Sequence, residues 1–226
     1  MFDIYLLNTD HFLTDIPYLR SLLSIDEWQR VERFKQKIQA DKSCIARANL
    51  RIILSKYLNI NPAKIIFDYN QKGKPFLKDY PHLHFNLSHT DNLIVYGISD
   101  HLMGIDIENI NKKVKFQELA QRFFCPSEYI LMNQINPENE AKLFYTLWTA
   151  KEAYLKAIGE GLSGGLDSIE LSYNFQNEDV EITSAKIREE WQIKNCKIND
   201  NYLVSVAIKS KDELPDNLTI KKFEKY

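Results

Sequence analysis

The sequence has few of the residues that cross-link or interrupt a fold: among 226 residues there are three cysteines, seven glycines and seven prolines. Cys44, Cys125 and Cys196 are odd in number and far apart, so neither a disulfide framework nor a C-x-x-C zinc site is predicted. No apolar run approaches the roughly 18 residues of a membrane-spanning helix. Because 44% of the residues are hydrophobic, a largely disordered chain is not expected either.

An excess of charge of one sign is also missing. The chain has 29 Lys and Arg against 31 Asp and Glu, a net charge of −2, which gives no general attraction to nucleic acid or to an anionic membrane. Any anion site must therefore be local. Residues 1–7 include an early acid and a short apolar run, unlike a signal peptide. We expect a cytoplasmic protein with reduced thiols and with no nucleic-acid or membrane partner.

Hydrophobic spacing predicts an α+β fold built from two halves, residues 1–101 and 102–226. The predicted helices cover residues 25–36, 39–58, 114–133 and 138–158. The predicted strands cover residues 2–7, 65–67, 83–87, 93–98, 103–107, 168–173, 180–187 and 202–208. We expect the charged tail after Lys209 to lie on the surface.

The segment Gly104–Glu108 alternates apolar and acidic residues. On a strand this period places Asp106 and Glu108 on one face with their Cα atoms about 6.6 Å apart. Two such carboxylates can bind one divalent cation, since magnesium commonly takes one or two carboxylates and fills its other positions with phosphate and water. A half-exposed strand with an acidic outer face is the alternative explanation.

The segment Trp148–Lys156 lies in the longest predicted helix. Glu152 and Lys156 are four residues apart at the border of its apolar face, where a carboxylate can hold metal or take a proton and an ammonium can neutralise phosphate. An ordinary Glu–Lys surface pair explains the spacing equally well. Lys151 falls inside the apolar face, where the alternative to a role in the site is a buried stem with the ammonium reaching solvent.

Three further segments carry polar groups suited to an anion. Phe85–Asp91 ends an apolar strand in Ser88 and His89, both able to donate to phosphate, although a turn explains them too. In Lys72–Pro75 a glycine lies between two lysines and permits close backbone approach. Arg47 and Arg51 are four residues apart on one helix and suggest an anion clamp, with a solvated helix face as the alternative.

Taken in order, these segments resemble the signature series of surfactin-type (Sfp-type) 4′-phosphopantetheinyl transferases. The similar segments are Lys72–Pro75, Asn86–Thr90, Gly104–Glu108, Phe123–Phe124 with Glu128, and Trp148–Lys156. The resemblance spans about residues 25–175. It implies a monomer of two pseudo-symmetric halves, with coenzyme A bound in the cleft at their interface.

The resemblance also implies roles for individual residues. The metal ligands would be Asp106, Glu108 and Glu152, holding Mg²⁺, with Mn²⁺ as an alternative, against the pyrophosphate of coenzyme A. The residues near the phosphates of coenzyme A would be Lys156, His89, Ser88, Lys42 and Arg47. The residues bordering the adenine would be Lys72, Lys74 and Pro75. For the 3′-phosphate only Arg30 and Arg33 remain as candidates, because Glu27 and Gln29 interrupt the basic helix.

The implied reaction moves the phosphopantetheine arm of coenzyme A onto a serine of an acyl or peptidyl carrier protein. The serine hydroxyl attacks the β-phosphorus and 3′,5′-ADP leaves. The implied catalytic residues are Glu152, Lys156 and Asp106, with Glu152 our first choice as general base. A metal ligand has a lowered pKa, so a water relay or Asp106 remains an alternative base. The resemblance does not distinguish carriers of nonribosomal peptide, polyketide or other secondary-metabolite synthesis from those of fatty-acid synthesis.

Carrier proteins are acidic, so we expect a docking surface with basic and apolar residues, formed from residues 112–125 and including Lys112, Lys113, Lys115 and Phe116. Two other classes of protein are disfavoured. A binding module without activity is disfavoured because the acidic and basic site residues are all present. A metal-dependent phosphodiesterase or nucleic-acid enzyme is disfavoured by the near-neutral charge.

Overall fold

The computed structural model describes residues 1–226 apart from 162–163, 186–189, 213, 216–217 and 225–226. The α-helices are α1 (Ile16–Ser21), α2 (Ile25–Glu32), α3 (Lys37–Leu58), α4 (Phe116–Phe123), α5 (Pro126–Gln134) and α6 (Pro137–Ile158). Short 3-10 helices are η1 (Thr9–Asp15), η2 (Pro62–Lys64) and η4 (Leu166–Ser168). The strands are β1 (Phe2–Asn8), β2 (Asp68–Tyr69), β3 (Pro75–Phe76), β4 (His84–Thr90), β5 (Leu93–Ser99), β6 (Met103–Asn109), β7 (Ile169–Tyr173), β8 (Val180–Ala185), β9 (Trp191–Asn199), β10 (Tyr202–Lys209) and β11 (Ile220–Lys222).

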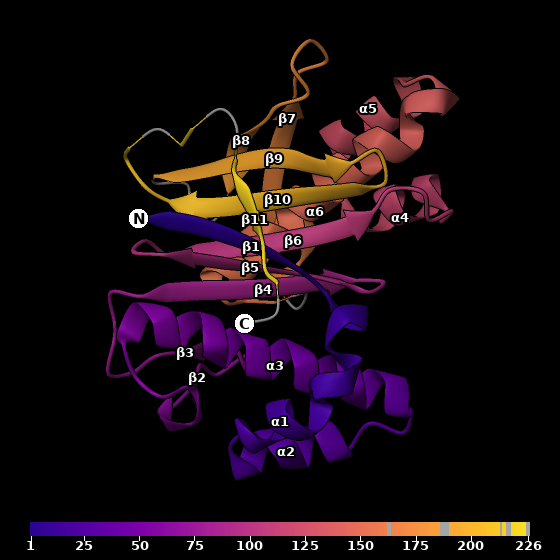
Figure 1. The fold of residues 1–226 in the computed structure, drawn as a ribbon. Helices are drawn as coiled ribbons and strands as arrows, with labels where there is room; N and C mark the ends of the chain where they lie inside the picture. Colours follow the sequence, from indigo (N-terminus) through magenta and orange to yellow (C-terminus); the bar gives the residue numbers. More distant parts are fainter. Residues whose placement is uncertain (162–163, 186–189, 213, 216–217, 225–226) are drawn as a thin grey trace.

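Two sheets form the centre of the molecule (Figure 1). The first has the strand order β11-β1-β5-β4, in which β11 runs parallel to β1 and the other neighbours are antiparallel. The second is antiparallel with the order β6-β10-β9. The sheets meet where β4 and β6 lie side by side, and there the Ile105 N–H donates to Asn86 Oδ1 at 2.9 Å. The hairpins β2–β3 and β7–β8 are separate small sheets.

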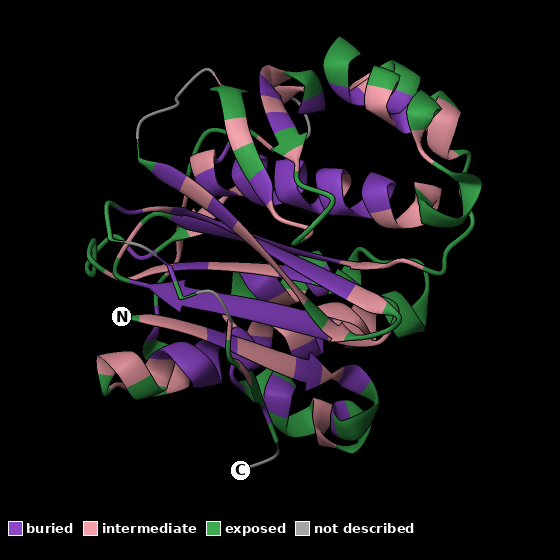
Figure 2. Cartoon of the chain, turned by 90° about the horizontal axis from the view of Figure 1, so that it is seen from above, coloured by how far each residue is buried: buried purple, intermediate pink, exposed green. Residues whose placement is uncertain are grey.

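Three hydrophobic clusters follow from the alternation of side chains along the strands. In β5, Ile94 and Tyr96 pack with α3, whereas Val95 faces the opposite way and packs with Ile105 of β6. The third cluster lies between α6 and the second sheet. The long helices α3 and α6 therefore cover the outer faces of the two sheets. Figure 2 shows buried residues running through the central strands, with exposed residues on the outer helices and loops.

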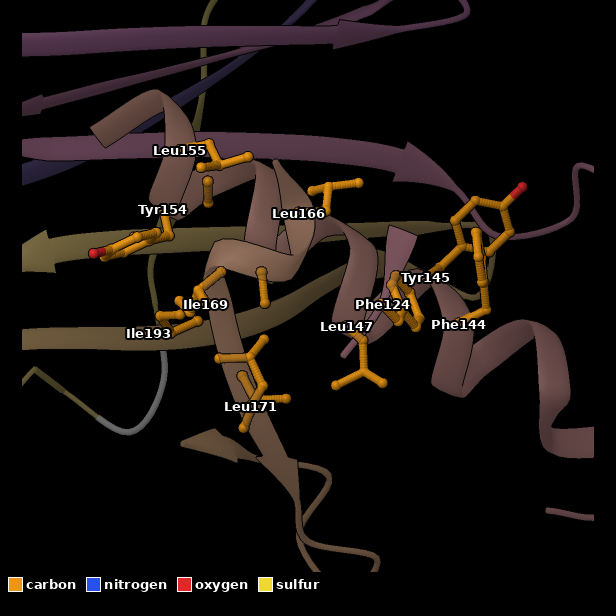
Figure 3. Close-up of a cluster of buried hydrophobic side chains, with 14 of the residues drawn as sticks. Phe124, Phe144, Tyr145, Leu147, Tyr154, Leu155, Leu166, Ile169, Leu171 and Ile193 are labelled. Atoms are coloured by element: carbon orange, nitrogen blue, oxygen red, sulfur yellow. The ribbon is translucent and has the colours of Figure 1, made fainter. Parts of the chain in front are cut away.

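Helix α6 is defined by its ends and by its aromatic face. Pro137 occupies the first turn, where its missing N–H costs nothing, and Gly159 ends the helix in a left-handed conformation at φ 76°. In the N-terminal half of α6, Phe144 stacks against Phe124 with ring centroids 5.4 Å apart (Figure 3). This packing holds α6 against the segment between α4 and α5.

The α+β class and most of the predicted elements are confirmed. The helical signal over 114–133 corresponds to two helices with a break between them, because α4 ends at Phe123 and α5 begins at Pro126. Proline lacks a backbone N–H and disfavours helical geometry in the preceding residue, and Cys125 is extended with ψ 154°. The strand predicted at 65–67 is wrong, since β2 is Asp68–Tyr69. Strand β8 ends at Ala185, and residues 186–187 of that prediction lie outside the described residues.

The prediction that the tail after Lys209 lies on the surface is wrong in part. Strand β11 pairs with β1, and Leu214 and Phe223 are buried. The C-terminal segment thus completes the first sheet, whose other strands lie within residues 2–99. Within the described residues, the helices are too short or too polar to cross a membrane.

Candidate active site

The site is built where α6 crosses β6. Gly104 makes this crossing close: a Cβ at this position would lie 2.0 Å from the Ala153 carbonyl oxygen and 2.4 Å from the Ala157 nitrogen, both in the α6 backbone. Because side chains alternate along β6, Asp106 and Glu108 share the face of Gly104 and point toward α6. Glu152 and Lys156 lie on the side of α6 that meets this face.

Asp106 is the most tightly held of these groups. It is buried, and its Oδ1 accepts from Lys156 Nζ at 2.6 Å and from the Ser88 hydroxyl at 2.7 Å. Lys156 Nζ also donates to Ser88 Oγ at 2.7 Å, which closes a three-residue network across β4, β6 and α6. Asp106 Oδ2 is buried without a hydrogen-bond partner among the described residues. One acceptor oxygen in the site is therefore unused.

Glu152 is buried beside the other two carboxylates. Desolvation, and then the negative charges of Asp106 and Glu108, raise the pKa of Glu152 to about 7, against the opposing effect of Lys156. Desolvation and the charge of Asp106 raise the pKa of Glu108 as well. Carboxylates that disfavour each other's ionisation must be close together in a medium of low dielectric. The charges of Asp106, Glu108 and Glu152 therefore influence one another's ionisation, and their joint role as metal ligands stays a prediction.

This arrangement fits a hard divalent cation. The described residues contain no assembled group of three or more His, Cys, Asp or Glu ligands. Magnesium does not need such a group, because it usually takes one or two carboxylates and completes its shell with water and substrate phosphate. The unused Asp106 Oδ2 and the mutual repulsion of the carboxylates are both features that a cation would relieve.

A cleft of about 700 Å³ opens beside the carboxylates, between α3 and β4. Of the predicted site residues it is lined by Lys42, Arg47, His89 and Glu108. Lys42 Nζ donates to the Asp91 carbonyl at 2.8 Å. Desolvation, and then the positive charges of Lys156 and Lys42, lower the pKa of His89, which favours its neutral ring. The cleft thus offers Lys42, Arg47 and an imidazole to an anionic ligand.

The other three predicted ligand-binding residues lie in or beside a hairpin near the C-terminal end of α6. The hairpin β2–β3 carries Lys72 at its exposed turn and Pro75 in β3. Lys74 Nζ donates to the carbonyls of Ala157 at 2.8 Å and Met103 at 3.2 Å. Lys74 therefore joins the hairpin to the end of α6 and the start of β6. None of the three lines the cleft, and their contact with adenine stays a prediction.

Two interpretations of basic residues are wrong. Arg51 forms no anion clamp with Arg47, because it is buried and pairs with Glu27 at 2.7 Å. Lys151 does not extend to solvent: it is 0% exposed and lies 2.8 Å from Glu128, which is 1% exposed. Both charges are matched by buried acids from other elements, and such partners are not visible in local spacing.

The cleft also includes residues that the sequence did not single out. Thr9 and Phe34 line it, from η1 and from the loop between α2 and α3. Lys112, which we predicted for the carrier-docking surface, lines the cleft instead, donating to Thr90 Oγ1 at 2.7 Å and lying 3.1 Å from Asp91 Oδ1. Thr9 and Phe34 carry no local signal, since only the folded chain brings them to α3.

Comparison with known proteins follows the two halves of the chain. The 4′-phosphopantetheinyl transferase superfamily pattern matches residues 102–207, and the pattern of the N-terminal region of 4′-phosphopantetheinyl transferases matches residues 13–100. The 4′-phosphopantetheinyl transferase HetI of Nostoc sp. is 36% identical over 194 residues, which are 84% of this chain and 80% of HetI. Sfp of Bacillus subtilis is 28% identical over 204 residues, covering 90% of this chain and 89% of Sfp.

Among solved structures, the holo-[acyl-carrier-protein] synthase of Thermotoga maritima aligns with a TM-score of 0.40 and 20% identity, over 49% of this chain and 63% of that one. The sequence relationships establish the class: the chain belongs to the 4′-phosphopantetheinyl transferase superfamily. It is therefore a 4′-phosphopantetheinyl transferase, which moves the phosphopantetheine arm of coenzyme A to a carrier protein.

Proposed function

We propose that this transferase is magnesium-dependent and that Asp106, Glu108 and Glu152 hold the metal, with manganese as a possible substitute. The observation that supports the proposal most is the position of Glu152, whose pKa is raised to about 7 by burial and by the two carboxylates of β6. A bound divalent cation would supply Lewis-acid stabilisation of the charge on the pyrophosphate.

The cations of the site bind and orient coenzyme A in this proposal. Lys156 holds phosphate oxygens while its bonds with Asp106 Oδ1 and Ser88 Oγ keep it in position, since an ammonium has three donors. His89, neutral because its pKa is lowered, donates a hydrogen bond rather than a charge. Lys42 and Arg47 lie in the cleft where the nucleotide phosphates would enter, and Ser88 stays bonded to Asp106.

Glu152 is the proposed general base for the carrier serine hydroxyl. A base serves best when its pKa is near the working pH, and burial gives Glu152 such a value in the free protein. Asp106 is a poorer choice because its Oδ1 already accepts two hydrogen bonds. When Glu152 holds metal its pKa is lowered, and a water molecule beside it would then take the proton instead.

We place the carrier-docking surface on the segment before α4. Lys113 and Lys115 are exposed there, with Val114 38% exposed between them. Phe116, which we had included, is not available because its ring packs 5.2 Å from that of Phe144. Replacing Lys113 and Lys115 by Glu should raise the KM for an acidic carrier and leave the KM for coenzyme A unchanged. An unchanged KM for the carrier would contradict this placement.

The test of the function is direct. The protein is incubated with coenzyme A, Mg²⁺ and a panel of apo-carriers from peptide, polyketide and fatty-acid synthesis, and each carrier is weighed by mass spectrometry. The proposal predicts that at least one carrier gains the phosphopantetheine arm, and that chelation of the metal stops the gain. Release of 3′,5′-ADP without an acceptor would instead indicate a phosphodiesterase.

A further inference from the structure

A pair of buried hydroxyl groups joins α6 to the second sheet. Thr149 of α6 and Ser205 of β10 are both 0% exposed, and their oxygen atoms are 2.5 Å apart. Thr149 Oγ1 also donates to the Tyr145 carbonyl at 2.8 Å, and Ser205 Oγ lies 2.7 Å from Asn195 Oδ1 of β9. Apolar side chains of similar size would fill this position without needing partners. This series of buried hydrogen bonds therefore needs an explanation other than packing.

The hydroxyl pair lies directly beside the active site. Thr149 precedes Glu152 by three residues, which places both on one side of α6. Ser205 is the cross-strand partner of Asp106 in the β10–β6 ladder, so both side chains are on the face of the sheet that meets α6. One hydrogen bond thus links the helix that carries Glu152 and Lys156 to the strand next to Asp106.

The same crossing of helix and sheet is also bridged by an ion pair, in which Lys156 of α6 lies 2.6 Å from Asp106 of β6. The bond between Thr149 and Ser205 joins α6 to the neighbouring strand β10 about two turns earlier on the helix. Because it is buried, the bond is not weakened by competition with water.

The number of available protons indicates which group donates in each of these hydrogen bonds. Three contacts connect Tyr145, Thr149, Ser205 and Asn195, and two hydroxyl groups supply only two protons. The Asn195 amide nitrogen is meanwhile buried without a partner among the described residues. If the amide is turned so that Nδ2 faces Ser205, it supplies the third proton, and every contact has one donor. An unbroken series of hydrogen bonds then connects β9 through β10 to α6.

We propose that Thr149 and Ser205 are positioning residues, which hold α6 on the sheet at the spacing that aligns Glu152 and Lys156 with Asp106 for transfer. The inference rests on the proposed function, because it concerns the alignment of those groups. It does not give either hydroxyl a contact with substrate. The hydrogen bonds of Thr149 and Ser205 are therefore expected to affect the rate of transfer rather than the binding of coenzyme A.

The test compares Thr149→Val, Ser205→Ala and their double variant with the wild type, at a temperature well below every melting temperature. We expect each single variant to lower kcat about tenfold, since small misalignments of reacting groups are costly. The KM for coenzyme A should change less than about twofold, because the groups proposed to bind it are untouched. The double variant should be no worse than the more impaired single variant, since both remove one shared bond.

Two further variants separate alignment from packing. Thr149→Ser keeps the hydroxyl and should restore most of the kcat. Thr146→Val is the matched control, because Thr146 lies about one turn earlier on α6, is only 3% exposed, and meets Thr149 Oγ1 only through its backbone carbonyl, which the change keeps. Its kcat should equal that of the wild type. Melting temperatures and calorimetric titration with coenzyme A, measured on every variant, report folding and binding without the transfer reaction.

The contrary results are equally defined. A Thr149→Val protein with a lower melting temperature but wild-type kcat would show that the pair only stabilises the fold, and the inference would be wrong. An equal loss of kcat in Thr146→Val would also overturn it. A wild-type protein that transfers nothing would instead overturn the proposed function, and this inference with it. If Thr149→Val does not fold, Ser205→Ala, which removes a single atom, decides the question.

Discussion

At the scale of single residues, the free site is held together by its own charges. Lys156 and Ser88 both bond to Asp106 Oδ1, so the position of a phosphate-binding ammonium is fixed before any substrate arrives. Such preorganisation reduces the reorganisation needed during reaction. The same arrangement leaves Glu152 close to the negative charges of β6, which help to raise its pKa.

Much of this arrangement could be predicted from spacing. The period of two placed Asp106 and Glu108 on one face, and the helical period placed Glu152 beside Lys156. Lys151 shows the limit of such reasoning. Its position inside an apolar face indicated a snorkelling side chain, whereas the fold supplies Glu128 from α5 as a buried partner. A partner that is distant in sequence leaves no trace in the local pattern.

Lys74 gives a prediction about pH. Burial lowers the pKa of Lys74 to about 8, while an unfolded lysine titrates near 10.4. Between these values the unfolded chain binds more protons, so the Lys74 contribution to the free energy of unfolding rises with pH. Relative to Lys74→Met, the wild type should therefore gain stability from about pH 8 to 10 in urea unfolding.

Lys72→Met is the control for this measurement, because Lys72 is exposed on the same hairpin. The difference in free energy of unfolding between this variant and the wild type should not change across the same pH range. A constant difference for Lys74→Met as well would show that the Lys74 ammonium is not buried as described.

At the scale of elements, the pair Lys151–Glu128 ties α5 to α6 and to β7. Lys151 Nζ donates to the carbonyls of Leu166, at 2.9 Å, and of Ile169. Glu128 accepts from the N–H groups of Cys125 and Leu171, each at 2.8 Å. Four backbone groups from three segments thus depend on one ion pair. The junction between α4 and α5, which the sequence pattern missed, is fixed here.

Lys151→Met should lower the free energy of unfolding by about 3 to 5 kcal/mol, because it leaves the Glu128 carboxylate buried without its counter-ion. Urea unfolding measures the change. Lys115→Met is the comparison: Lys115 also pairs with a glutamate, Glu118, but both side chains are largely exposed, and such pairs contribute little. Equal losses in the two variants would contradict the buried character of the Lys151 pair.

At the scale of the whole molecule, the chain closes on itself. The C-terminal strand β11 joins the sheet built by β1, β5 and β4, and Phe223 packs between Tyr5 and Phe12 with ring centroids 6.2 and 6.3 Å away. The two helix-covered sheets were foreseeable from the repeated order of helices and strands. The return of the tail was not, because a three-residue strand in a charged segment carries almost no periodic signal.

Phe223→Ala should destabilise the protein by about 3 to 5 kcal/mol, the usual result of removing a buried aromatic ring. Phe175→Ala serves as the control, since Phe175 is 58% exposed and should change the stability far less. Thermal or urea unfolding compares the two. A neutral Phe223→Ala variant would mean that the tail does not contribute to the fold in solution.

The central claim is that carboxylates from β6 and α6 form one catalytic site, and Glu152→Gln tests it most directly. This change keeps the size of the side chain and removes one of three mutually repelling charges. The variant is incubated with coenzyme A, Mg²⁺ and an apo-carrier, and mass spectrometry measures how much carrier is modified. We predict that this transfer is lost, while the melting temperature of the free protein stays the same or rises. A Glu152→Gln protein that modifies the carrier at the wild-type rate would contradict the account.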